Sequence, residues 1–166
     1  MINEPRIRDF TPDDLEAVWK MNQAAVDAVS SVSREQMSAL VAMSRDVLVV
    51  DDGRELVGFC NTFNTGADYD SVNYRWFSER YDDFVYLDRI VITESQRNHG
   101  LGARLYEEIE HRMIAAGGPY FLACEVNFDP PNEGSLRFHR RIGFSPVGRQ
   151  ESKPGLVVEM FGKHLR

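Results

Sequence analysis

The sequence lacks several features that define particular classes of protein. It has two cysteines in 166 residues, which excludes a disulfide framework and a cysteine-rich zinc site. Basic residues are in the minority, 19 against 26 acidic ones for a net charge of −7. This balance argues against a nucleic-acid binder with a broad cationic face. No apolar run approaches the roughly 18 residues of a membrane-spanning helix.

Other absences narrow the class further. The first residues lack the basic and then apolar layout of a secretory signal, and the chain has no internal repeat or low-complexity tract. No two histidines or cysteines stand at the spacing of metal ligands. We therefore expect a single cytoplasmic domain over residues 1–166, with no metal and with no nucleic-acid or membrane partner.

The chain does contain a succession of well-marked helices and strands. Thr11 predicts the start of a helix whose apolar positions recur as far as Val29, and Ser33 with Gln36 predicts a capping box that opens a second helix. Two apolar runs on either side of residues 51–54 predict a hairpin. Further strands are expected at 84–92, 120–126, 145–150 and 156–161, with helices at 101–116 and 132–142.

The expected order of elements is β-α-α-β-β-β-α-β-α-β-β. We therefore predict an α/β (α+β) fold, a mixed, twisted central sheet of about six or seven strands with about four or five helices on both faces. The aromatic segment 64–83 is too long for a bare connection. We interpret it as a short helix or a flap that either lines an acceptor pocket or packs on the sheet, and we favour packing.

The most informative stretch runs from Arg89 to Ala103. An apolar strand and a short turn lead into a loop with Gly100 and Gly102 that opens a helix. Amides at a helix start lack partners within the helix and favour an anion, and glycine lets that anion approach the backbone closely. Basic side chains beside the loop are Arg97, His99 and Arg104. A pyrophosphate is the ligand that this pattern favours.

Two other phosphate-binding patterns fit less well. The P-loop requires Lys and then Ser or Thr after its last glycine, whereas Ala103 and Arg104 follow Gly102. A dinucleotide fingerprint needs a small residue where the chain has Leu105, although Glu125 stands near the distance of that motif's acidic residue. A dinucleotide-dependent enzyme is therefore the weaker alternative.

The loop, Arg97-x-x-Gly100-x-Gly102 after an apolar strand, resembles the acetyl-coenzyme A loop of the GNAT (GCN5-related N-acetyltransferase) superfamily. The resemblance implies that backbone groups of the strand pair with the pantetheine arm of acetyl-CoA and that the loop amides hold its pyrophosphate. The implied cofactor-binding residues are Ile90, Val91, Ile92, Arg97, Asn98, His99, Gly100, Leu101 and Gly102.

A later stretch, Asn132-x-x-Ser135-x-x-x-His139 followed by Gly143-Phe144, resembles a second signature of that family, in which tyrosine stands where this chain has His139. The resemblance implies that Asn132 also contacts the pantetheine region. Together with the order of elements, the two motifs cover nearly the whole chain and imply a single GNAT-type domain.

The implied chemistry needs a base, because an alkylammonium must lose a proton before it attacks a thioester. Glu125-Val126 resembles the Glu-Val at a base position in some family members, so Glu125 is the preferred candidate. A Glu125 that is simply exposed to water is the alternative. Glu94 and Asp88 are weaker candidates, and Asp88 beside Arg89 is equally explained by a structural ion pair.

The departing thiolate needs stabilisation, and the family usually has a tyrosine for this purpose. His139 takes its place here. A neutral imidazole can donate one N–H to the thiolate, and a packed, hydrogen-bonded His139 is an equally weighted alternative.

The resemblance thus implies an acetyl-CoA-dependent N-acetyltransferase in which a primary amine attacks the thioester directly in a ternary complex. The acidic charge balance suits a small amine or an amino-acid-like acceptor, with a protein N-terminus or lysine as the second choice. A non-catalytic acyl-CoA sensor is an alternative, and a homodimer is implied by the resemblance alone.

Overall fold

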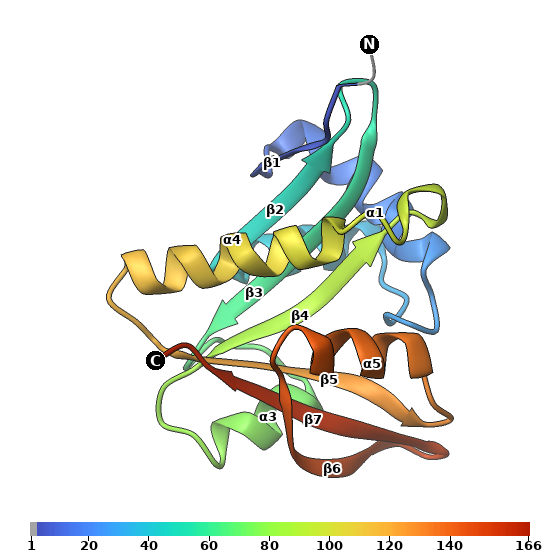
Figure 1. The fold of residues 1–166 in the computed structure, drawn as a ribbon. Helices are drawn as coiled ribbons and strands as arrows, with labels where there is room; N and C mark the ends of the chain where they lie inside the picture. The colour runs from blue at the N-terminus through green and yellow to red at the C-terminus, as the bar shows by residue number, and fades with distance from the viewer. Residues whose placement is uncertain (1–2) are drawn as a thin grey trace. The chain divides into compact units, whose positions relative to one another are not determined.

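The computed structural model describes residues 3–166. Its strands are β1 (Arg6–Asp9), β2 (Asp46–Asp51), β3 (Leu56–Asn64), β4 (Val85–Ile92), β5 (Phe121–Asp129), β6 (Ser145–Lys153) and β7 (Leu156–His164). Its α-helices are α1 (Leu15–Ala24), α2 (Arg34–Met43), α3 (Val72–Ser78), α4 (Leu101–Ala115) and α5 (Glu133–Arg141). The seven strands pair in the order β1-β2-β3-β4-β5-β7-β6 (Figure 1). The predicted mixed α/β sheet is confirmed.

The observed order differs from the predicted one in one added element. Helix α3 stands between β3 and β4, inside the aromatic segment. The first helix also ends earlier than predicted, at Ala24 rather than near Val29. Beyond the end of the helix, Ser30 O accepts from the Asn22 side-chain amide at 3.1 Å, and Asp27 adopts a φ of +90°. The capping box of Ser33 and Gln36 is confirmed.

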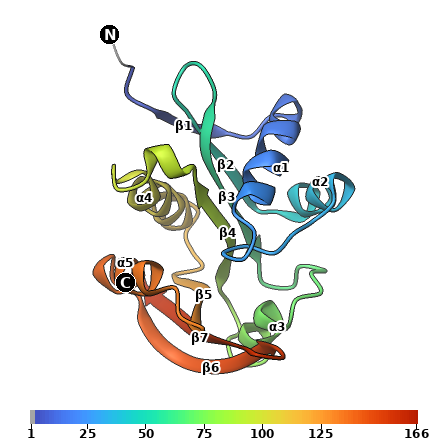
Figure 2. The same cartoon turned by 90° about the vertical axis from the view of Figure 1, so that its right-hand side faces the viewer.

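The chain forms two compact units, Met1–Phe63 with Leu87–Ile109 and Asn64–Tyr86 with Glu110–Arg166. In the first unit α1 and α2 cover one face of β2, β3 and β4, and the first turns of α4 cover the other (Figure 2). The core beneath α1 and α2 consists of Val18, Met21, Met37, Val49, Phe59 and Val91. The prediction of a single domain stays a prediction.

A buried arginine on β4 anchors the segment that follows α1. Arg89 is 5 % exposed and donates to Asn22 Oδ1 at 2.9 Å and to Ser30 O at 2.7 Å. Its Nε lies 3.1 Å from Asp88 Oδ2. A buried cation requires such partners, so the structural ion pair proposed for Asp88 is confirmed.

In the second unit α3 and α5 lie on opposite faces of the strands β5, β7 and β6 (Figures 1 and 2). Helix α3 buries Tyr74 and Phe77, and both rings contact Tyr86, with centroids 5.4 and 5.9 Å away. The aromatic segment is therefore a packed helix, as favoured. On β6, a Cβ at Gly148 would lie 2.5 Å from Trp76 Cζ2, so only glycine fits beneath this indole.

No helix within residues 3–166 combines the length and the apolar character that a membrane span requires.

The ion pair of Arg8 and Asp14 predicts acid-sensitive stability. Arg8 Nη1 lies 2.8 Å from Asp14 Oδ2, and this guanidinium, with the Thr11 N–H, holds the pKa of the buried Asp14 carboxyl below its ordinary value. A depressed pKa adds stability above the unfolded value of about 3.9 and loses it as the pH falls through the folded value. The free energy of unfolding, measured by urea titration, should therefore fall less steeply with decreasing pH in Asp14→Asn than in the wild type. The exposed control Asp13→Asn should keep the wild-type slope, and equal slopes in all three proteins would contradict this assignment.

Candidate active site

The entrance of α4 has the geometry of an anion site. Residues 97–100 are exposed, and Asn98 and Gly100 adopt φ values of +65° and +76°. No heavy atom of residues 3–166 outside its chain neighbours lies within 4 Å of an ideal Cβ at Gly100. Arg104 N donates to Gly100 O, so the amides of residues 101–103 precede the helical ladder. These features fit the pyrophosphate that the sequence predicts.

The basic side chains near this loop divide between two tasks. Arg97 is exposed and its Nε donates to Ile92 O at 3.2 Å, which ties the turn to the end of β4. His99 is exposed. Arg104 is instead directed to the N-terminal segment, where Nη2 donates to Pro5 O at 3.0 Å and Nη1 lies 3.6 Å from Glu4. The positive charge that Arg104 was expected to add beside the loop is therefore partly neutralised by Glu4.

Strand β4 offers backbone groups along one edge. Thr93 N donates to Val57 O at 2.9 Å, and Val91 O would lie 3.0 Å from a Cβ at Gly58. Successive residues of a strand direct their backbone groups to opposite edges, so Ile90 and Ile92 face away from β3. Pantetheine pairing stays a prediction for these two residues. Val91 does not fit it, because its carbonyl lies against β3.

Glu125 on β5 is held by two donors of the second unit. Tyr86 donates its hydroxyl to Glu125 Oε2 at 2.6 Å, and Asn73 donates its side-chain amide to Oε1 at 3.2 Å. Glu125 is half-buried, so the alternative of a carboxylate simply exposed to water is wrong. A carboxylate oriented by two donors can accept a proton from a nearby amine, and the base role stays a prediction.

The sequence analysis missed both of these partners. Tyr86 lies in an apolar strand and Asn73 in the aromatic segment, and nothing in their local sequence distinguishes them from packing residues. They are 39 and 52 positions from Glu125 in the chain, so only the tertiary fold brings the three together. The weaker base candidate Glu94 lies exposed in a 3₁₀ turn after β4.

His139 is a packed histidine. It is 4 % exposed, its ring stacks on Phe161 with centroids 5.9 Å apart, and its Nδ1 lies 2.7 Å from Ser135 O. Burial lowers the pKa of this imidazole, which favours the neutral ring. A carbonyl only accepts, so a neutral ring with its hydrogen on Nδ1 fits this contact. The predicted donation to a thiolate does not fit this tautomer, and the packed alternative does.

Asn132 begins α5. Its Oδ1 accepts from Ser135 N at 3.2 Å, which makes it the N-cap of the helix. A cap satisfies an amide that the helix leaves unpaired, and its contact with pantetheine stays a prediction. Within residues 3–166 no group of three or more histidine, cysteine, aspartate or glutamate side chains could hold a metal ion.

The position of the hydrogen on the His139 ring can be measured by NMR. Long-range ¹H–¹⁵N NMR at pH 7 should show a neutral ring with its hydrogen on Nδ1, because Ser135 O accepts it and burial disfavours the charged form. His139→Asn identifies the signal by its loss. A hydrogen on Nε2, or on both nitrogens, would restore His139 as a donor.

Comparison with known proteins agrees with this geometry. The profile of the Acetyltransferase (GNAT) family matches residues 11–144. Similar solved structures include Arabidopsis thaliana NAA60 in complex with acetyl-CoA (TM-score 0.77, 16% identity, 97% of this chain and 99% of that chain) and yncA from Salmonella typhimurium with acetyl-CoA (0.71, 16%, 99% and 95%). The ribosomal-protein-S18-alanine N-acetyltransferase from Escherichia coli is also similar (0.74, 14%, 98% and 94%). A search of curated proteins found no significant match. At such identities the structures show the fold alone, and the profile match shows that the chain belongs to the GNAT acetyltransferase family.

Proposed function

We propose that this protein is an acetyl-CoA-dependent N-acetyltransferase that acetylates a primary amine. The observation that carries the proposal is the match of the GNAT family profile over residues 11–144. The open, anion-compatible entrance of α4 supports it, because an acyl carrier with a pyrophosphate needs such a site.

The residues that would hold the cofactor come from both motifs. The backbone edge at Ile90 and Ile92 would pair with the pantetheine arm, the amides from Asn98 to Gly102 would hold the pyrophosphate, and Asn132 would contact pantetheine. When bound, acetyl-CoA supplies a thioester whose carbonyl carbon is open to attack and whose thiolate leaves.

Glu125 would prepare the acceptor. Alkylammonium groups ordinarily titrate near pH 10, so little free amine exists at neutral pH. The carboxylate of Glu125 would take the proton, directly or through water, and leave a nitrogen lone pair for attack. Its two donors, Tyr86 and Asn73, keep the carboxylate in one orientation.

The leaving thiolate would not receive a hydrogen from His139, since Nδ1–H is held by Ser135 O. Thiols titrate near pH 8.5, well below alkylammonium groups. A thiolate can therefore leave without being protonated, whereas the amine must lose a proton before it attacks. His139 would instead support the site by packing α5 on β7 through Phe161.

A small amine or an amino-acid-like molecule is the first choice of acceptor, because the chain carries a net charge of −7 and amines are cationic. A protein N-terminus or lysine is the second choice. It is supported by the similarity to the Escherichia coli enzyme named for the alanine of ribosomal protein S18. Assays with small amines and with an alanine-initiated peptide would separate these acceptors.

A substitution in the loop tests cofactor binding. Gly102→Glu should abolish the thermal stabilisation that acetyl-CoA gives the wild type, since it adds bulk and negative charge beside a phosphate. Ala39→Glu, which adds the same charge at an exposed position of α2, should keep it. NAD and ATP should stabilise neither protein. Undiminished acetyl-CoA binding by a folded Gly102→Glu protein would count against the proposal.

A second substitution tests the base. Thiol release from acetyl-CoA with a panel of amines should fall by about 10²-fold in Glu125→Gln, and the acidic limb of its pH–rate profile should disappear because the amide cannot titrate. An acidic limb retained in this variant would assign the base elsewhere. Stabilisation by acetyl-CoA without thiol release for any acceptor would favour the sensor alternative.

A further inference from the structure

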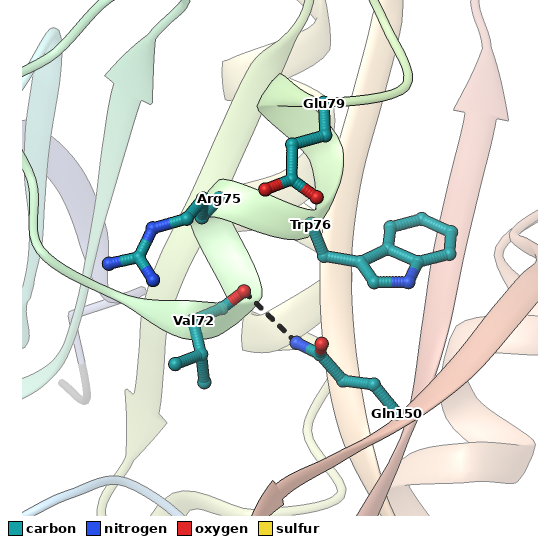
Figure 3. Close-up of a pocket in the computed structure, with 5 residues that line it drawn as sticks. All are labelled: Val72, Arg75, Trp76, Glu79 and Gln150. Carbon is teal, nitrogen blue, oxygen red and sulfur yellow. Dashed lines mark hydrogen bonds between the residues drawn. The ribbon is translucent and has the colours of Figure 1, made fainter.

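Glu125 is the end of a chain of side-chain hydrogen bonds that begins on β6. Gln150 donates its amide to Val72 O at 3.0 Å, a bond drawn in Figure 3, and to Asn73 Oδ1 at 2.8 Å. Asn73 in turn donates to Glu125 Oε1 at 3.2 Å. Three elements, β6, α3 and β5, are thereby connected through polar groups.

The donor and acceptor roles along this series of hydrogen bonds are determined at Val72. Val72 contributes a backbone carbonyl, which only accepts, so the NH₂ side of Gln150 must face α3. The second hydrogen of that NH₂ then requires the oxygen of Asn73, and the NH₂ of Asn73 must face Glu125. A reversed Asn73 would place its oxygen against a carboxylate oxygen. Oε1 of Glu125 is therefore the acceptor of this hydrogen bond.

Gln150 also lines a surface hollow of about 180 Å³ with Val72, Arg75, Trp76 and Glu79 (Figure 3). Both hydrogens of the Gln150 amide are donated to α3, one to Val72 O and one to Asn73 Oδ1. Gln150 therefore orients the side chain of Asn73. Trp76 and Phe77 are buried on α3, which fixes the helix that carries Asn73.

We propose that Asn73 is a positioning residue for the reaction, which holds Glu125 Oε1 as Tyr86 holds Oε2 and is itself oriented by Gln150. This inference rests on the proposed function of Glu125. Each carboxylate oxygen has two lone-pair directions, and one donor on each oxygen prevents the carboxylate from rotating. A carboxylate held in one orientation presents its oxygens to an acceptor amine in a constant direction, which is what general-base transfer demands.

The test reads Glu125 directly and needs no known acceptor. Protein labelled with [δ-¹³C]glutamate reports each carboxyl titration by NMR, and Glu125→Gln identifies the Glu125 signal. Asn73 on α3 and Met160, the β7 partner of Glu125, do not titrate, and Tyr86 on β4 is common to the wild type and the Asn73 variants. A shifted midpoint in an Asn73 variant therefore reports the lost amide.

Loss of a donor disfavours the charged carboxylate, so the midpoint should rise. We expect a rise of about half a pH unit in Asn73→Ala and of about one unit in the isosteric Asn73→Asp, which sets two carboxyl groups together. Ser71→Ala removes the N-cap of α3 without touching Glu125 and should leave the midpoint unchanged. Gln150 lies on the edge strand β6, so Gln150→Ala does not disturb the core. This variant should raise the titration midpoint of Glu125 by less than Asn73→Ala does.

A rate measurement completes the test. With an amine that supports thiol release, Asn73→Ala should lower kcat about tenfold, leave the KM for acetyl-CoA unchanged and move the acidic limb of the rate profile to higher pH. Wild-type titration in the Asn73 variants, or in Gln150→Ala should the Asn73 variants fail to fold, would overturn the proposal. So would a shifted midpoint with an unaltered kcat. If the wild type releases no thiol with any amine or peptide, the proposed function fails, and the titration still decides whether Asn73 holds Glu125.

Discussion

The structure depends on one constraint, that charge removed from water must be met by hydrogen bonds. Arg89, Glu159 and Glu125 illustrate it in different ways. Arg89 is buried and is surrounded by the groups that fix the segment after α1. Glu159 on β7 is 2 % exposed and is paired with Arg149 at 2.7 Å. Glu125 is only half-buried, and its two donors leave it able to take part in chemistry. The first two ion sites hold the fold, and the third is the proposed base.

The features that could be predicted from the sequence were those with a local physical cause. Ser33 and Gln36 are three residues apart, so their capping box is visible in the sequence, and the aspartate–glycine turn before β3 determines its hairpin. The glycine loop is likewise local, because the start of a helix and the freedom of Gly100 are encoded within a few residues. These signals were sufficient for the fold class and for the proposed cofactor.

The features that could not be predicted depend on distant residues. The segment after α1 is held by Asn22 and by Arg89 far along the chain, which both donate to Ser30 O. The tautomer of His139 depends on two neighbours. The contact with Ser135 O follows from the helical spacing of the two residues, but burial against β7 cannot be predicted from that spacing. The donors of Glu125 come from α3 and β4, and no spacing rule relates them to β5. Motif matching therefore proposes candidate residues, and tertiary contacts decide what each of them can do.

The glycine beneath Trp76 connects the packing of α3 with the orientation of the proposed base. Gly148 contributes no functional group, yet the absence of a side chain allows the indole to rest on β6. That contact sets how far α3 stands from the strand, and the same helix carries Asn73 three positions earlier in the chain. The orientation of the proposed base thus depends in part on an empty volume, because a methyl group at position 148 would force a shift of Trp76 on the helix that carries Asn73.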